Sequence, residues 1–187
     1  MNQETKNENS KKFGISREEP LLELNNKYLS PPSQITENVY LGNIYDARNL
    51  ERLQKLGINK VLSIITDPNL VSYPESIEHK LIDIADYPKE NIIKYFGECL
   101  SFINDDNKKV FVHCFGGASR SASIIIAYLM WKNVISYEES FDILKKLRPI
   151  INPNDGFIKQ LQIFDKLLRK NKYNINKIKF EEIKYIP

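Results

Sequence analysis

Short apolar runs alternate along this chain with segments whose apolar residues recur at helical spacing. Val61–Ile65 and Val110–Val112 are rich in β-branched residues, which is typical of strands buried on both faces of a parallel sheet. Residues 92–103 and 121–132 have the helical period instead. Because parallel strands must be joined by long crossovers, usually helices, the alternation predicts an α/β fold with a mostly parallel central sheet flanked by helices.

The remaining elements follow from shorter signals. The further predicted elements are strands over residues 35–41 and 81–84, a helix over 47–56 that ends at Gly57, and helices after the capping box at 136–139 and after residues 152–155. Asn154 and Asp155 are interpreted as helix-capping residues without a chemical role. Strands interleaved with helices and followed by helices alone indicate one domain with a helical cluster on one face of its sheet.

Both ends of the chain are polar and lack apolar periodicity. Residues 1–33 are predicted to form a mobile polar arm that runs into a proline-containing turn. Residues 34–169 are predicted to form the globular domain, and 170–187 a Lys/Asn-rich tail with scattered Ile, Phe and Tyr. The sequence leaves open whether this tail docks on the domain, pairs with something else or frays.

Composition excludes several classes of function. Lys+Arg 27 against Asp+Glu 24 gives a net charge of +3 with the signs interspersed, which disfavours nucleic-acid binding through bulk charge. The most apolar stretch, Ile124–Trp131, is too short for membrane insertion, and Asn2 in place of Gly excludes N-myristoylation. Two cysteines and a polar start favour a reducing compartment, so we expect the cytoplasm, with the nucleus as a second location.

The segment from His113 to Ser121 follows a predicted strand and precedes a predicted helix, where open α/β sheets bind their ligands. Loop N–H groups, a helix N-terminus and the Arg120 guanidinium would together form a cradle for a tetrahedral dianion such as phosphate. The same positive field favours the nucleophilic thiolate form of Cys114. The cradle would consist of Phe115, Gly116, Gly117, Ala118, Ser119 and Arg120.

This segment resembles the HCxxGxxR[S/T] signature of cysteine-dependent protein tyrosine phosphatases, and its SRS ending resembles the dual-specificity branch. The compact chain is similar to the small, atypical members of that branch. Gly116 departs from the alanine that is usual there, which adds loop freedom and removes no catalytic group. Further similar segments, which extend the resemblance over residues 34–168, are Val39–Gly42, Leu56–Ile58, Ala127–Met130, Arg148–Pro149, and Pro153–Asn154 followed by Gly156–Phe157.

The resemblance implies a role for several residues of the loop. Cys114 would be the nucleophile that forms a phosphocysteine, and Arg120 would bind phosphate through bidentate hydrogen bonds. Ser121 would help the thiolate leave the intermediate, the alternative being a helix cap alone. His113 is expected to be a structural residue that hydrogen-bonds the loop backbone. Cys99 is expected in the core, with a redox pairing to Cys114 left open.

The leaving oxygen needs a proton, and a carboxylic acid on a loop at the end of a strand could supply it. Asp83 and Asp86 are the two candidates. Asp86 lies in a segment, Ile84–Pro88, that resembles the general-acid loop of the family, whereas Asp83 is expected to be still in the strand. We therefore predict Asp86 as the general acid.

The resemblance implies a protein phosphatase that acts on phosphotyrosine and phosphoserine/phosphothreonine, with phosphoproteins as partners and with no cofactor or metal. The alternatives are a phosphoinositide or glucan phosphatase of the same superfamily, or a catalytically dead phosphate-binding adaptor. Uncharged Phe115, Ala118 and Ser119 argue against phosphoinositides, which need additional basic groups for their extra phosphates. The physiological substrate and the oligomeric state are not determined by the sequence.

Overall fold

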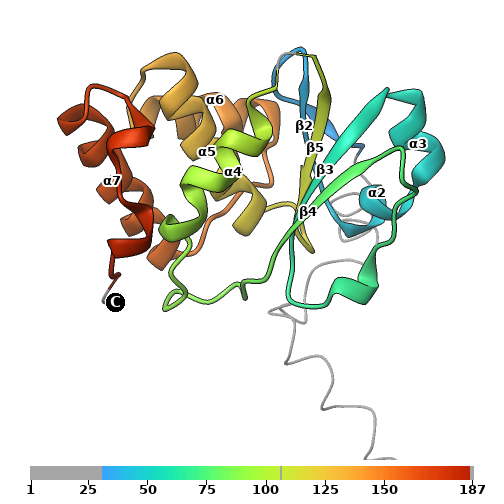
Figure 1. Cartoon of the computed structure of the whole chain (residues 1–187), viewed down its shortest axis with the longest axis horizontal. Helices are drawn as coiled ribbons and strands as arrows, with labels where there is room; N and C mark the ends of the chain where they lie inside the picture. The colour runs from blue at the N-terminus through green and yellow to red at the C-terminus, as the bar shows by residue number, and fades with distance from the viewer. Residues whose placement is uncertain (1–30, 106, 186–187) are drawn as a thin grey trace, which may run out of the picture. The chain divides into compact units, whose positions relative to one another are not determined.

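The computed structural model describes residues 31–105 and 107–185, so the arm predicted over residues 1–33 lies outside the described residues as far as residue 30. The described chain forms a five-stranded sheet in the order β1-β2-β5-β3-β4, with helices on both faces (Figure 1). The strands are β1 (Ser33–Gln34), β2 (Val39–Gly42), β3 (Ile58–Ile64), β4 (Glu78–Ile82) and β5 (Lys109–His113). Only β1 pairs antiparallel, which confirms the predicted α/β fold with a mostly parallel sheet.

The helices divide into two groups. The short helices α2 (Ile44–Arg48) and α3 (Leu50–Lys55) cover one face of the sheet, and the longer helices α4 to α7 cover the other (Figure 1). The longer helices are α4 (Phe96–Ile103), α5 (Arg120–Asn133), α6 (Tyr137–Leu147) and α7 (Asp155–Lys170), with short 3-10 turns at Pro68–Leu70, Ile93–Tyr95, Ile175–Lys177 and Phe180–Glu182. The larger apolar core lies between the sheet and these longer helices, and α5 is buried along most of its length.

Two predicted elements differ from the structure in their extent. The strand predicted over 35–41 is wrong in its first half, because the amides of Ile35 and Thr36 both donate to the carbonyl of Val39, at 2.8 and 3.3 Å, and close a turn between β1 and β2. The helix predicted over 47–56 is two helices. Asn49 ends α2 and caps α3, since its side chain accepts from the amide of Arg52 at 2.9 Å.

Strand β4 ends earlier than predicted. Its last paired residue, Ile82, faces Ile64, the last residue of β3, so the ladder has no further partner. The expectation that Asp83 lies in the strand is therefore wrong. Asp83 is exposed and is the first residue of the segment that leads to Asp86.

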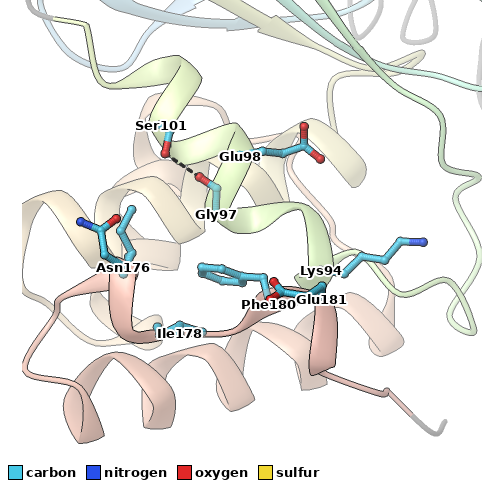
Figure 2. A pocket seen from close by; sticks show the side chains of 9 residues that line it. Lys94, Gly97, Glu98, Ser101, Asn176, Ile178, Phe180 and Glu181 are labelled. Atoms are coloured by element: carbon cyan, nitrogen blue, oxygen red, sulfur yellow. Dashed lines mark hydrogen bonds between the residues drawn. The ribbon is translucent and has the colours of Figure 1, made fainter.

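The C-terminal tail contacts the domain next to α4. The Phe180 ring lies against Gly97 (Figure 2). It packs on Phe164 with a centroid distance of 5.9 Å. A Cβ on Gly97 would stand 2.5 Å from that ring, so the residue without a side chain is what admits it. Trp131 Nε1 donates to the Tyr173 carbonyl at 3.1 Å. Of the alternatives that the sequence leaves open for the tail, residues 173–183 adopt the first and dock on the domain.

Replacing Phe180 tests how much the docked tail contributes to stability. Phe180 is 8% exposed, and a Phe-to-Ala change at such a site removes apolar burial and leaves a cavity. We expect Phe180→Ala to lower the free energy of unfolding by about 3 kcal/mol, measured by urea denaturation. Glu182→Ala, which removes an exposed ion pair with Lys179, is the matched control and should cost well under about 1 kcal/mol. Equal effects of the two changes would contradict a structural role for the docked ring.

Candidate active site

The Cys114 sulfur lies at the start of the loop between β5 and α5. The residue is 1% exposed, and two groups donate hydrogen bonds to Sγ: the Gly117 amide at 3.2 Å and the Ser121 hydroxyl at 3.1 Å. Ser121 is in the first turn of α5, whose N-terminal amides add a positive field. The sulfur therefore accepts one hydrogen bond from the loop backbone and one from the first turn of α5.

The backbone of the loop is held by its carbonyl groups. The Cys114 carbonyl lies 3.2 Å from His113 Nδ1, and the Gly117 carbonyl accepts from Arg148 Nε at 2.9 Å. Three further carbonyls accept from backbone amides: Phe115 from Ile44 at 3.0 Å, Ala118 from Asn152 at 2.8 Å and Ser119 from Ser123 at 2.8 Å. A trans peptide unit points its C=O and N–H in opposite directions. The N–H groups opposite these tethers belong to Phe115, Gly116, Ala118, Ser119 and Arg120, which are residues of the predicted cradle.

Gly117 has a backbone that requires glycine. Its φ is +65°, and a Cβ there would stand 2.5 Å from the Gly42 carbonyl oxygen and 2.7 Å from an Arg148 nitrogen. Arg148 is buried, and its Nη2 has no hydrogen-bond partner within the described chain. The loop is thus wedged between β2 and a buried cation, a contact that the sequence analysis did not anticipate.

Arg120, the first residue of α5, lies beside the loop rather than out in solvent. The residue is 9% exposed, and its Nη1 donates to the Ile84 carbonyl at 3.2 Å. Its Nε lies 3.6 Å from Asp86 Oδ2, an ion pair without a hydrogen bond, and Nε is otherwise unpartnered among the described residues. A buried guanidinium with an unused donor is suited to grip an incoming oxyanion.

Asp86 lies on the segment after β4 and is joined to the loop through Ser119. Its Oδ1 accepts from the Ser119 hydroxyl at 2.6 Å and from Asn154 Nδ2 at 2.9 Å, and the Asn154 amide donates to Ser119 Oγ at 3.2 Å. The Asp86 side chain is 34% exposed, so it remains accessible to a substrate. Asp83 makes no side-chain hydrogen bond or ion pair with the rest of the described chain.

Asn154 is a site residue that the sequence analysis assigned to helix capping alone. Its Oδ1 does cap α7, accepting from the Phe157 amide at 3.0 Å. Its Nδ2 is left over from the cap and orients Asp86. A capping asparagine always has this spare donor, which is the signal that could have suggested a second role. Asp155, also interpreted as a capping residue, is the first residue of α7.

His113 lies behind the loop, fully buried, with its Nδ1 on the Cys114 carbonyl. Burial lowers its pKa to about 4, so the ring is neutral near pH 7. Cys99 is a free thiol in the larger core, and burial raises its pKa, which keeps it a thiol. Phe115 is exposed at the rim, while Gly116 and Ala118 are half-buried.

The described residues contain neither a metal-binding cluster nor a helix that could span a membrane. No group of three or more His, Cys, Asp and Glu side chains in residues 31–105 and 107–185 is arranged to hold a metal ion. Among the helices that the structure describes, none combines the length and apolar character needed to cross a membrane.

Comparison with known proteins agrees with the site. A family model described as "Dual specificity phosphatase, catalytic domain" matches residues 39–166. Human dual specificity protein phosphatase 9 is 38% identical over 142 residues, which are 74% of this chain and 37% of that protein. Dual specificity protein phosphatase 1 of Arabidopsis thaliana is 33% identical over 141 residues, 74% of this chain and 71% of that protein.

A solved structure extends the comparison. The crystal structure of the human tyrosine phosphatase-like serine/threonine/tyrosine-interacting protein matches with a TM-score of 0.71 at 33% identity, over 74% of this chain and 98% of that one. A parallel strand, an anion-binding loop that contains a cysteine, and an arginine at the start of the next helix are features of cysteine-dependent phosphatases. This chain belongs to the dual specificity phosphatase family. It spans 37% of the human relative and 36% of a Dictyostelium discoideum relative.

Proposed function

We propose that this protein hydrolyses phosphotyrosine and phosphoserine/phosphothreonine in proteins through a phosphocysteine. The observation that carries the proposal is the Cys114 sulfur, which two hydrogen bonds hold inside a loop whose carbonyls are tethered. Family membership supports the reaction class. The proposed steps use side chains and backbone amides of this chain.

In the first proposed step the Cys114 thiolate attacks phosphorus, a P–S bond forms and the ester P–O bond breaks. The Asp86 carboxylic acid gives its proton to the departing oxygen, so the product leaves as an alcohol or phenol. Arg120 turns its free Nε from Asp86 to the phosphoryl oxygens, and the loop amides hold the remaining charge. The 3.6 Å contact between Arg120 Nε and Asp86 Oδ2 is thus exchanged for an ion pair between Arg120 and the substrate phosphoryl group.

In the second proposed step Asp86, now a carboxylate, takes a proton from a water molecule. The water oxygen attacks phosphorus, the P–S bond breaks and inorganic phosphate is formed. The Ser121 hydroxyl, which donates to Sγ at 3.1 Å, stabilises the thiolate as it leaves. Ser119 and Asn154 keep Asp86 in place for both proton transfers.

The substrate class is tested with the purified chain on phosphotyrosyl and phosphothreonyl peptides, a phosphoinositide and a phosphoglucan. Hydrolysis of both peptides at rates well above the other two substrates is the expected result. Preferred hydrolysis of the lipid or the glucan would replace this proposal with the corresponding alternative. Binding of vanadate without turnover of any substrate would instead indicate a phosphate-binding adaptor.

Arg120→Lys tests the proposed phosphate ligand. A lysine keeps the charge but cannot reproduce the planar, two-pronged grip of a guanidinium. We expect kcat/KM for an aryl phosphate to fall about 10²-fold, as when one transition-state donor is lost. Arg169→Lys is the matched control, since Arg169 is exposed and pairs with Asp165 in the same helix. A near-normal rate for Arg120→Lys would show that Arg120 is not the phosphate ligand.

A further inference from the structure

A chain of hydrogen-bonded side chains runs across the sheet to the catalytic loop. Ser63 Oγ lies 2.7 Å from His113 Nε2 and 2.8 Å from His79 Nε2, while His113 Nδ1 lies 3.2 Å from the Cys114 carbonyl oxygen. Ser63 faces His113 across β3 and β5, and β4 places His79 opposite Val61, two residues before Ser63. Ser63 and His113 are fully buried, whereas His79 is exposed. The relay therefore connects the surface with the loop.

The direction of each hydrogen bond in the relay is determined by the Cys114 carbonyl, which can only accept. His113 Nδ1 must carry a hydrogen, and because this buried ring is neutral, its Nε2 is an acceptor. Ser63 then gives its single hydroxyl hydrogen to His113, and its oxygen must accept from His79 Nε2–H. Every donor in the relay therefore points toward the loop, and His79 is its outermost donor.

Tyr73 supports the relay without replacing it. Its ring meets the His79 ring edge-on with a centroid distance of 4.7 Å, which fixes the plane of the imidazole. Its hydroxyl lies 3.5 Å from His113 Nε2, at the outer limit of a hydrogen bond, against 2.7 Å for Ser63. Loss of the His79 donor would thus be felt mainly through Ser63.

We propose that His79 is a positioning residue for the catalytic loop, acting through Ser63 and His113. Held in one tautomer, His113 keeps its hydrogen bond to the Cys114 carbonyl. Because the C=O and N–H of a trans peptide unit point in opposite directions, this bond also fixes the direction of the Phe115 N–H. The inference rests on the proposed phosphatase function in naming the loop catalytic. The orientation of the loop amides can nevertheless be measured without turnover.

The test compares two replacements of His79 in aryl phosphate hydrolysis. His79→Phe keeps the ring beside Tyr73 but removes the donor, and we expect kcat to fall about 5-fold, the usual worth of one hydrogen bond. His79→Gln offers an amide N–H in place of the imidazole donor and should stay within about 2-fold of the wild type. Lys80→Gln, the next residue of β4, which pairs with Glu98, is the control and should leave kcat unchanged.

Ser63→Ala decides whether His79 acts through the relay. It should lower kcat about 10-fold, and adding His79→Phe to it should cause no further loss, because the connection is already broken. A second readout is the ratio of Cys114 alkylation rates with iodoacetate and iodoacetamide, since only iodoacetate carries an anion for the cradle. This ratio should fall about 5-fold in His79→Phe and recover in His79→Gln.

Wild-type values of kcat and alkylation ratio in His79→Phe would overturn the inference. A further 5-fold loss from His79→Phe in the Ser63→Ala background would also overturn it, because His79 would then act independently of Ser63. If the wild-type protein hydrolyses no aryl phosphate, the proposed function fails, and the alkylation ratio alone decides whether His79 orients the loop. Melting temperatures of all variants separate a change in the loop from a loss of folding.

Discussion

Cys114→Ser is expected to reduce hydrolysis of p-nitrophenyl phosphate at least about 10⁴-fold, because it removes the nucleophile that forms the covalent intermediate. A serine hydroxyl at this position is a much weaker nucleophile than a thiolate, and no histidine or carboxylate among the described residues contacts Sγ to take the hydroxyl proton. The fold should survive, since a serine oxygen can still accept from Gly117 and Ser121. The measurements are steady-state turnover and the circular dichroism spectrum.

Cys99→Ala is the matched control for this nucleophile test. Cys99 is the second free thiol of the described chain, lies in the apolar core, and takes no part in the proposed reaction. Its replacement should leave kcat close to the wild-type value. Turnover that persists in Cys114→Ser would reject the phosphocysteine route, and turnover that disappears in Cys99→Ala would require a role for the core thiol.

Asp86→Asn is expected to lower turnover of a phosphopeptide by about 10²- to 10⁴-fold, the usual contribution of a general acid. An asparagine oxygen can still accept the hydrogen bonds from Ser119 and Asn154, so the change removes the transferable proton with little change in shape. The defect should shrink on aryl phosphates with acidic leaving groups, which depart without protonation. A series of aryl phosphates of graded leaving-group pKa measures this dependence.

Asp83→Asn is the matched control for the general acid. Asp83 lies three residues earlier on the same segment, is exposed, and has no side-chain partner in the described part of the chain. Its replacement should lower turnover only slightly on any substrate, and the size of this loss should not depend on the leaving group. A leaving-group-dependent defect in Asp83→Asn alone would transfer the acid role from Asp86 to Asp83.

The fold class and the loop were predictable because their signals are local. Buried strands and their crossover helices have distinct periods, and the nine residues from His113 to Ser121 bring the sulfur, the arginine and the helix start together without help from distant segments. Element ends were less predictable. Where β4 stops depends on where β3 stops, which is a property of the pair rather than of either segment.

Contacts between distant residues account for what the sequence analysis missed. The hydrogen bond from Asn154 to Asp86 joins residues 68 apart, and His113 meets Ser63 across 50 residues. Helix capping is a sufficient explanation for Asn154, and a single serine in a strand needs no explanation. The adjacent residues therefore indicate no second partner for either side chain. Only the register of the sheet and the approach of α7 to the acid segment bring these pairs together.

The docked tail also bears on the solubility of the domain. Trp131 and Phe164 belong to the helical cluster, and Phe180 and Tyr173 lie against them. A protein shortened to residue 169 would present that apolar surface to water, where it becomes a site for self-association. The Lys- and Asn-rich composition of residues 170–187 gives this cover a polar outer side. Removal of the C-terminal segment is therefore expected to promote aggregation of the domain.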